Sequence, residues 1–171
     1  EIETDLLAGR DRVRVVNAGA GRLKVKLGKI YQIQIQSDVA GRLIMIDVDA
    51  AGKITQILPN GFVKSDQLLR IAAGEKITVP TRERFNFDGF EASLPLGAGK
   101  VLIVVAPNDF PVELTLNEET KVQRTRGLVP VVSPVPYLMN ILSQIRTGAT
   151  QAQTRGAANW AFTVLNYDIE P

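Results

Sequence analysis

The 171-residue sequence contains no cysteine and no histidine. These absences exclude thiol and imidazole nucleophiles, histidine general bases, Ser-His-Asp triads and the cysteine or histidine ligands of zinc sites. They also leave no disulfide from which a compartment could be inferred, so periplasmic and cytoplasmic localisation both stay open. Among the remaining side chains, carboxylates are the candidates for acid–base chemistry.

Strong charge of one sign is also lacking, since the formal net charge is +2 and the isoelectric point is about 9.0. A balance this mild does not predict nucleic acid as a partner. With 45% hydrophobic and 22% charged residues, the chain is predicted to form one folded domain over residues 1–171. It begins with Glu1 and no leader pattern follows, so we expect a piece of a longer protein.

One stretch, residues 127–145, carries no charge and approaches the length of a membrane span. It contains three prolines near its start, which would break a spanning helix, so no membrane span is predicted. Its apolar residues instead follow helical spacing and predict one late α-helix over about 134–147. The residues on that helical face are Leu138, Ile141, Leu142 and Ile145.

Alternation of polar and apolar residues dominates the rest of the chain and predicts half-buried strands separated by glycine-rich turns. The predicted strands are 12–16, 22–27, 30–36, 41–49, 53–58, 75–80, 83–90, 100–107 and about 159–169. The run 100–107 is apolar on both faces, which indicates a central strand. The predicted fold class is all-β, an antiparallel β-sandwich of seven to nine strands, immunoglobulin-like or jelly-roll-like.

The sequence "IDVDAAGKITQ" at 46–56 starts like a calcium-binding loop, with Asp47, Asp49 and Gly52 at loop positions 1, 3 and 6. Positions 5 and 12 are Ala51 and Leu58, so half of the ligands are missing. A hairpin turn with a positive φ at Gly52 explains the pattern better, and no metal site is predicted here. We predict no cofactor either.

Asp47 is less well explained by a turn. It shares a strand face with Leu43 and Met45, so we expect it to meet a lysine or arginine across the sheet. Asp47 and Asp49 could alternatively form a carboxylate pair for hydrolysis, because same-face residues two apart on a strand lie roughly 7 Å apart.

The first two predicted strands carry alternating bases, and pairing through "NAGAG" at 17–21 would place them on one face. Such a face would either bind an acidic partner or protect a sheet edge from aggregation. The bases are Arg12, Arg14, Arg22, Lys24 and Lys26.

Aromatic residues also alternate in two predicted strands. Trp160 and Phe162 share one face with Val164, and Phe85 shares another with Phe87. Core packing is the simpler interpretation, while exposure of these rings would favour a carbohydrate-binding or envelope-binding module.

Three segments carry a resemblance to a known family: "AGRLIMIDVDAAGKITQILPN" (40–60), "IAAGEKITVP" (71–80) and "LPLGAGKVLIVVAPNDFPV" (94–112). They resemble a bacterial domain of unknown function that typically follows a caspase-like peptidase domain in the same polypeptide. On this resemblance, residues 28–112 form the family-like core, 1–27 are basic N-terminal strands, and 113–171 hold a connector, the helix and the final strand.

The resemblance implies a non-catalytic accessory module of a cysteine peptidase of the caspase or metacaspase kind. Its partners would be the peptidase domain of the same polypeptide and a protein substrate. No catalytic residue carries over, because this chain has no counterpart of the peptidase's cysteine and histidine. Metacaspase-type peptidases cut after arginine or lysine, so Arg124 or Arg126 in the loop 121–127 is a candidate processing point. The alternatives are an envelope-binding or carbohydrate-binding module, or an aspartate-based hydrolase.

Overall fold

The computed structural model describes residues 12–17, 22–58, 69–85, 88–106, 129–130 and 161–171. Within these ranges most residues lie in strands, and the α-helical part is a single turn, α2, at Arg82–Phe85. The strands are β1 Val13–Val15, β2 Leu23–Lys26, β3 Ile30–Tyr31, β4 Ile33–Ser37, β5 Gly41–Val48, β6 Ile54–Leu58, β7 Arg70–Ile71, β8 Lys76–Val79, β9 Phe90–Glu91, β10 Gly97–Ala106, β11 Val129–Pro130 and β12 Ala161–Glu170.

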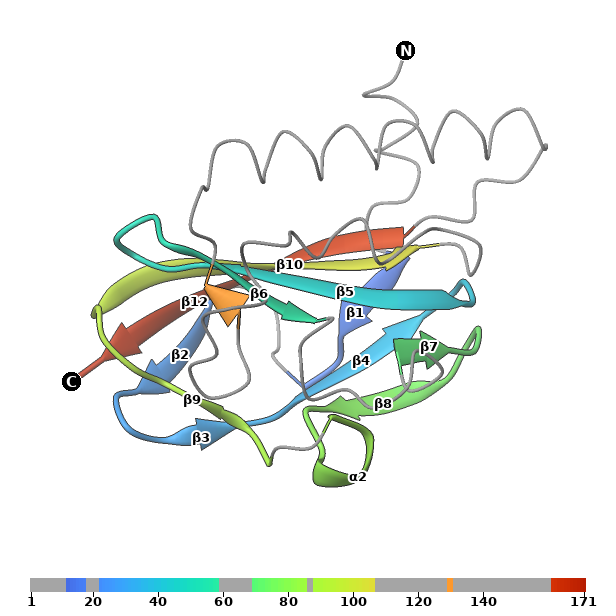
Figure 1. Ribbon diagram of the computed structural model, residues 1–171, viewed down its shortest axis with the longest axis horizontal. Helices are drawn as coiled ribbons and strands as arrows, with labels where there is room; N and C mark the ends of the chain where they lie inside the picture. The colour runs from blue at the N-terminus through green and yellow to red at the C-terminus, as the bar shows by residue number, and fades with distance from the viewer. Residues whose placement is uncertain (1–11, 18–21, 59–68, 86–87, 107–128, 131–160) are drawn as a thin grey trace, which may run out of the picture.

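The strands form a sandwich-like all-β fold, which confirms the predicted fold class (Figure 1). A large sheet has the order β11-β6-β5-β10-β12-β2, and β7 also pairs with β5. A small sheet has the order β1-β4-β8, and β3 and β9 form a separate ribbon. Strand β10 lies at the centre of the large sheet between β5 and β12, as its apolar faces predicted.

The main core fills the space between the two sheets, because strand alternation turns one set of side chains inward from each. The small sheet contributes Ile35 and Val79, and the large sheet contributes Leu43, Met45 and Ile103, all fully buried. A second apolar cluster lies on the opposite face of the large sheet and includes Ile44, Ile46 and Val104. Strands β5 and β10 are therefore buried on both faces, which explains their nearly continuous hydrophobic sequences.

Several local predictions were wrong. The segment 83–90, predicted as a strand, begins instead with the helical turn α2, in which the Phe85 amide donates to Thr81 O at 2.8 Å. The glycine-rich segment "LGAGK" at 96–100, one of the turns predicted between strands, instead contains the first part of β10, which begins at Gly97. Strands β7 and β11 carry too few residues for alternation to reveal them.

The largest correction concerns the two basic strands, which do not form a hairpin. Strand β1 pairs with β4 in the small sheet, whereas β2 pairs with β12 in the large sheet. The β2–β12 pairing is parallel, so the sheets are not wholly antiparallel. The chain crosses from one sheet to the other between β1 and β2, and the predicted five bases therefore do not share one hairpin face.

Candidate functional site

One end of the sandwich gathers several connections, and we call it the loop end. The amide of Gly28 donates to Ala92 O at 2.7 Å, and the amide of Leu27 donates to Glu170 O at 2.8 Å. These bonds join the β2–β3 turn to the segment after β9 and to the end of β12. The β5–β6 turn lies at this end as well, because Ala50 Cβ is 3.5 Å from an ideal Cβ at Gly97 (Figure 1).

The β5–β6 turn has the predicted hairpin geometry. Gly52 has a φ of 81°, and its amide donates to Asp49 O at 2.9 Å. The Asp49 carboxylate atom Oδ1 accepts hydrogen bonds from the amides of Ala51 and Lys53, each at 2.9 Å. The aspartate therefore folds back on its own turn, as aspartates at such positions do.

Asp47 has a different partner from the base that we predicted. The hydroxyl of Tyr167 donates to Asp47 Oδ1 at 2.7 Å. Asp47 lies on β5 and Tyr167 on β12, and the central strand β10 runs between them. The bond therefore spans a whole strand.

Gly99 on β10 makes this contact possible. Tyr167 is paired with Gly99 in the β10–β12 register, and a Cβ at Gly99 would overlap the Tyr167 ring. The ring thus occupies the space that a side chain on β10 would fill, and its hydroxyl reaches β5. A glycine inside a strand often marks such a close approach.

Burial raises the pKa of Asp47 to about 6, with the Tyr167 hydrogen bond acting in the opposite direction and the nearby Asp49 charge adding to the rise. The pKa of Tyr167 is raised as well, because burial and the Asp47 charge both disfavour the phenolate. The half-buried Asp47 carboxyl therefore changes its protonation near pH 6, while the Tyr167 phenol that donates to it stays protonated.

The two aspartates of the candidate hydrolytic pair make different hydrogen bonds within the protein. The Asp49 carboxylate is engaged by two amides of its own turn, and the Asp47 carboxylate by a phenol. Sequence reasoning identified Asp47 but missed Tyr167 and Gly99. Gly99 carried no usable signal, because with Gly97 two residues away it is typical of a turn and not of an isolated glycine within a strand.

The basic residues of β2 are matched by acidic residues of β12. Arg22 Nη1 lies 3.4 Å from Asp168, and Lys24 and Lys26 lie 3.6 and 3.5 Å from the carboxylate of Glu170. Parallel pairing in register brings these residues together. The three bases therefore line a mixed-charge strip, not a purely basic face.

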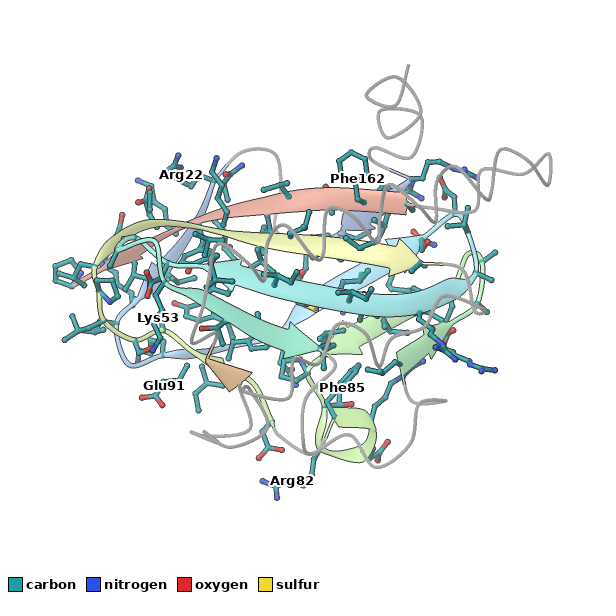
Figure 2. The ribbon with its side chains drawn as sticks, turned by 45° about the horizontal axis from the view of Figure 1, so that its top comes forward. Arg22, Lys53, Arg82, Phe85, Glu91 and Phe162 are labelled. Atoms are coloured by element: carbon teal, nitrogen blue, oxygen red, sulfur yellow. The ribbon has the colours of Figure 1, made fainter. Side chains whose placement is uncertain are left out.

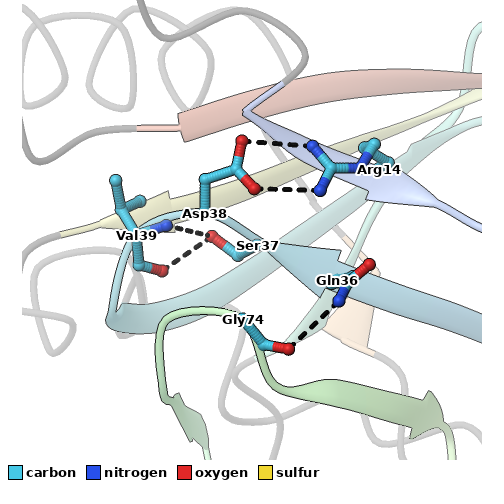
Figure 3. A network of polar contacts seen from close by, with 6 residues as sticks. All are labelled: Arg14, Gln36, Ser37, Asp38, Val39 and Gly74. Carbon is cyan, nitrogen blue, oxygen red and sulfur yellow. Dashed lines mark hydrogen bonds and ion pairs between the residues drawn. The ribbon is translucent and has the colours of Figure 1, made fainter.

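Arg14 lies on β1 of the small sheet, and Arg12 directly precedes that strand. Arg14 forms two hydrogen bonds to Asp38, at 2.9 and 3.1 Å (Figure 3). The backbone oxygen of Arg12 accepts from the Asp38 amide at 2.7 Å. The Arg14 guanidinium lowers the pKa of Asp38. Next to this pair, Ser37 Oγ donates to Val39 O at 2.7 Å, which shapes the bend between β4 and β5.

One of the described aromatic residues is buried and the others are half-buried. Phe85 is fully buried in the main core, and Phe162 is half-buried and packs against the cluster on the opposite face of the large sheet (Figure 2). Trp160, Phe87, the candidate processing residues Arg124 and Arg126, and the predicted helix at 134–147 lie outside the described residues.

Two other kinds of site are absent from the part of the chain that the structure describes. No helix there has the length and hydropathy needed to cross a lipid bilayer. In the same part of the chain, no group of three or more acidic side chains is placed to hold a metal ion.

Comparison with known proteins places the central segment in a family. A search of the curated proteins finds no match to this sequence. A scan against protein families matches residues 24–109 of the 171, from strand β2 past the end of β10, which includes the hairpin, Asp47 and Gly99. The chain belongs to the DUF4384 family, which is described as a domain of unknown function.

Proposed function

We propose that this chain is a non-catalytic interaction module, the accessory domain of a bacterial protein that also carries a caspase-like cysteine peptidase domain. The main support is the way its two candidate carboxylates are used. The Asp49 carboxylate accepts two amides of its own turn, and the Asp47 carboxylate accepts the Tyr167 hydroxyl. Both make contacts that hold strands and turns, which suits a scaffold better than a reaction centre.

Composition supports the same proposal. A chain without cysteine or histidine has no nucleophile–base pair of the cysteine-peptidase type. Its contribution to proteolysis would be to position a peptidase domain or a protein substrate. The link to a peptidase rests on the resemblance of the segments at 40–60, 71–80 and 94–112 to domains that follow such peptidases.

The first experiment uses the purified chain and peptides with arginine or lysine before the scissile bond. We expect no cleavage, both by the parent chain and by the Asp47→Asn variant. Cleavage by the parent that is lost in Asp47→Asn would overturn the non-catalytic assignment and favour the aspartate-based hydrolase.

The second experiment tests the partner. The complete open reading frame should encode a caspase-like domain, and that domain should be assayed with and without residues 1–171. We expect kcat/KM for a protein substrate to fall when the module is deleted, while cleavage of a short peptide changes little. An open reading frame without a peptidase domain, or equal losses on both substrates, would contradict the proposal.

A further inference from the structure

Exposed leucines occur together at the loop end of the sandwich. Leu27 lies in the β2–β3 turn and is 40% exposed, while Leu94 and Leu96 lie between β9 and β10 and are 70% and 41% exposed. The hydrogen bond from Gly28 to Ala92 joins these two segments. The exposed Ala50 and Ala51 of the β5–β6 turn add small apolar groups at the same end.

Lysines are concentrated on the same connections. Of the six lysines in the described residues, five lie on or beside the connections of the loop end, and all five are exposed; Lys76 on β8 is the sixth. The five are Lys24, Lys26, Lys29, Lys53 and Lys100. Figure 2 shows Lys53 at this end of the molecule.

The charge that faces solvent at the loop end is positive. Five carboxylates accompany the five lysines and Arg22 at this end: Asp47, Asp49, Glu91, Asp168 and Glu170. Asp168 lies 3.4 Å from Arg22, and Glu170 lies 3.6 and 3.5 Å from Lys24 and Lys26. Six cations against five carboxylates leave a surplus of one positive charge, and one of the five carboxylates, Asp47, is half-buried.

We propose that the loop end docks on an anionic lipid surface, with Leu27, Leu94 and Leu96 entering the interface and the lysines contacting lipid headgroups. Aliphatic side chains at loop tips bury apolar area in the headgroup region, while anionic lipids attract nearby lysines. Long lysine stems let the ammonium groups sit at headgroup level beside the inserted leucines. This docking goes beyond the proposed accessory role and does not depend on it.

A lipid surface fits this charge pattern better than a protein partner does. Lysine is depleted in protein–protein interfaces, where arginine is enriched, and the cations here are lysines with Arg22 at the margin. Arg22 is also paired with Asp168 at 3.4 Å. Leucines from two separate connections suit a deformable planar interface, which needs no matching groove.

The test is flotation of the purified chain with two kinds of vesicle, phosphatidylcholine alone and equal parts of phosphatidylcholine and phosphatidylglycerol. We expect binding to the anionic vesicles only, and release at high salt because the Debye length falls from about 10 Å at 0.1 M to about 3 Å at 1 M. Leu94→Ser with Leu96→Ser should weaken binding by about tenfold or more. Lys26→Gln and Lys29→Gln should each weaken it by about fivefold.

Two matched controls locate the surface. Val164→Ser removes an exposed apolar side chain from β12, and Lys76→Gln removes an exposed lysine from β8; both should leave binding unchanged within about twofold. Leu94→Ser alone changes a highly exposed residue, so it tests the leucines even where the double variant folds poorly.

Three results would overturn the proposal. The first is no binding of the parent chain to anionic vesicles. The second is full binding by folded leucine variants with loss only in the lysine variants, which would mean unspecific charge attraction. The third is an equal loss in the two controls.

Discussion

The two aspartates at the end of β5 stand in opposite environments although one residue separates them. Asp49 belongs to an exposed turn, and its carboxylate satisfies amides at most four residues away. Asp47 is half-buried, its pKa is raised to about 6, and its partner is 120 residues distant. Local hydrogen bonds therefore fix the turn. The contact between Asp47 and Tyr167 instead requires the strand order β5-β10-β12 and the space above Gly99.

The raised pKa of Asp47 is not by itself a sign of catalysis. Such a pKa is a feature of catalytic acids, but it equally marks a structural carboxyl that is buried with one hydrogen-bond donor. In Asp47 burial is the main cause, and the phenol of Tyr167 opposes it. The destabilising effect of a buried charge is thus tolerated for a contact that links β5 to β12 across β10.

The largest effect is expected from Gly99→Ala. A Cβ at this position overlaps the Tyr167 ring, so the ring must move and release Asp47. We expect a loss of about 3 kcal/mol in the free energy of unfolding, from overpacking and from an unpartnered half-buried carboxylate. Urea denaturation measures this loss.

The same substitution in a Tyr167→Ala chain tests whether the loss of stability comes from overlap with the Tyr167 ring. If the added methyl acts through Tyr167, then Gly99→Ala should cost much less in a Tyr167→Ala chain, and the double-mutant cycle should show strong coupling. Additive losses would mean that Gly99 is needed for another reason, such as its backbone conformation in β10.

The second-largest effect is expected in the pH dependence of the free energy of unfolding, which should distinguish the two aspartates. Because the folded pKa of Asp47 lies above the unfolded value of about 3.9, its stabilising contribution is fully present below about pH 4 and is lost as pH rises through about 6. The shift corresponds to about 2–3 kcal/mol at most. Asp47→Asn keeps an acceptor without the charge, so at pH 7 it should exceed the parent in stability, and the difference should vanish near pH 4.

Asp49→Asn is the matched control for this titration. Its amide oxygen can still accept from the turn amides, and it removes only a smaller cause of the raised Asp47 pKa, so most of the pH dependence that Asp47 gives the parent chain should remain. A pH profile of Asp49→Asn that matches that of Asp47→Asn would contradict the contrast between the two sites.

A smaller loss of stability is expected from a substitution in the β5–β6 turn. Gly52→Val should cost about 1–2 kcal/mol in unfolding free energy, because a side chain disfavours the positive φ of this residue. Nothing lies within 4 Å of a Cβ at Gly52, so the cost would come from the backbone alone. A thermal melt that matches the parent would show that the turn relaxes into another form.

The same contrast explains which features the sequence could predict. The turn was predictable because Asp49 and Gly52 carry its chemistry within four residues. The centre of the large sheet was predictable from the apolar run at 100–107. Alternation cannot say which strands are neighbours, so β1 and β2 were predicted to pair although they lie in different sheets. Without the strand order, no pattern could connect Asp47 to Tyr167.

Short elements were unpredictable for a different reason. The alternation in "ERFNF" extends over five residues, and one helical turn buries Phe85 equally well. Likewise, the glycines of 97–100 look like a turn, although Gly99 provides the space for a tyrosine ring within a strand. Tertiary contacts decided both cases.

The most direct test of the contrast is a measurement of the carboxyl pKa of Asp47 by NMR, in the parent chain and in Tyr167→Phe. We expect about 6 in the parent and a higher value in Tyr167→Phe, because the phenol hydrogen bond lowers this pKa. A parent pKa near 4, or a pKa that Tyr167→Phe leaves unchanged, would contradict the account of Asp47 as a buried carboxyl held by Tyr167.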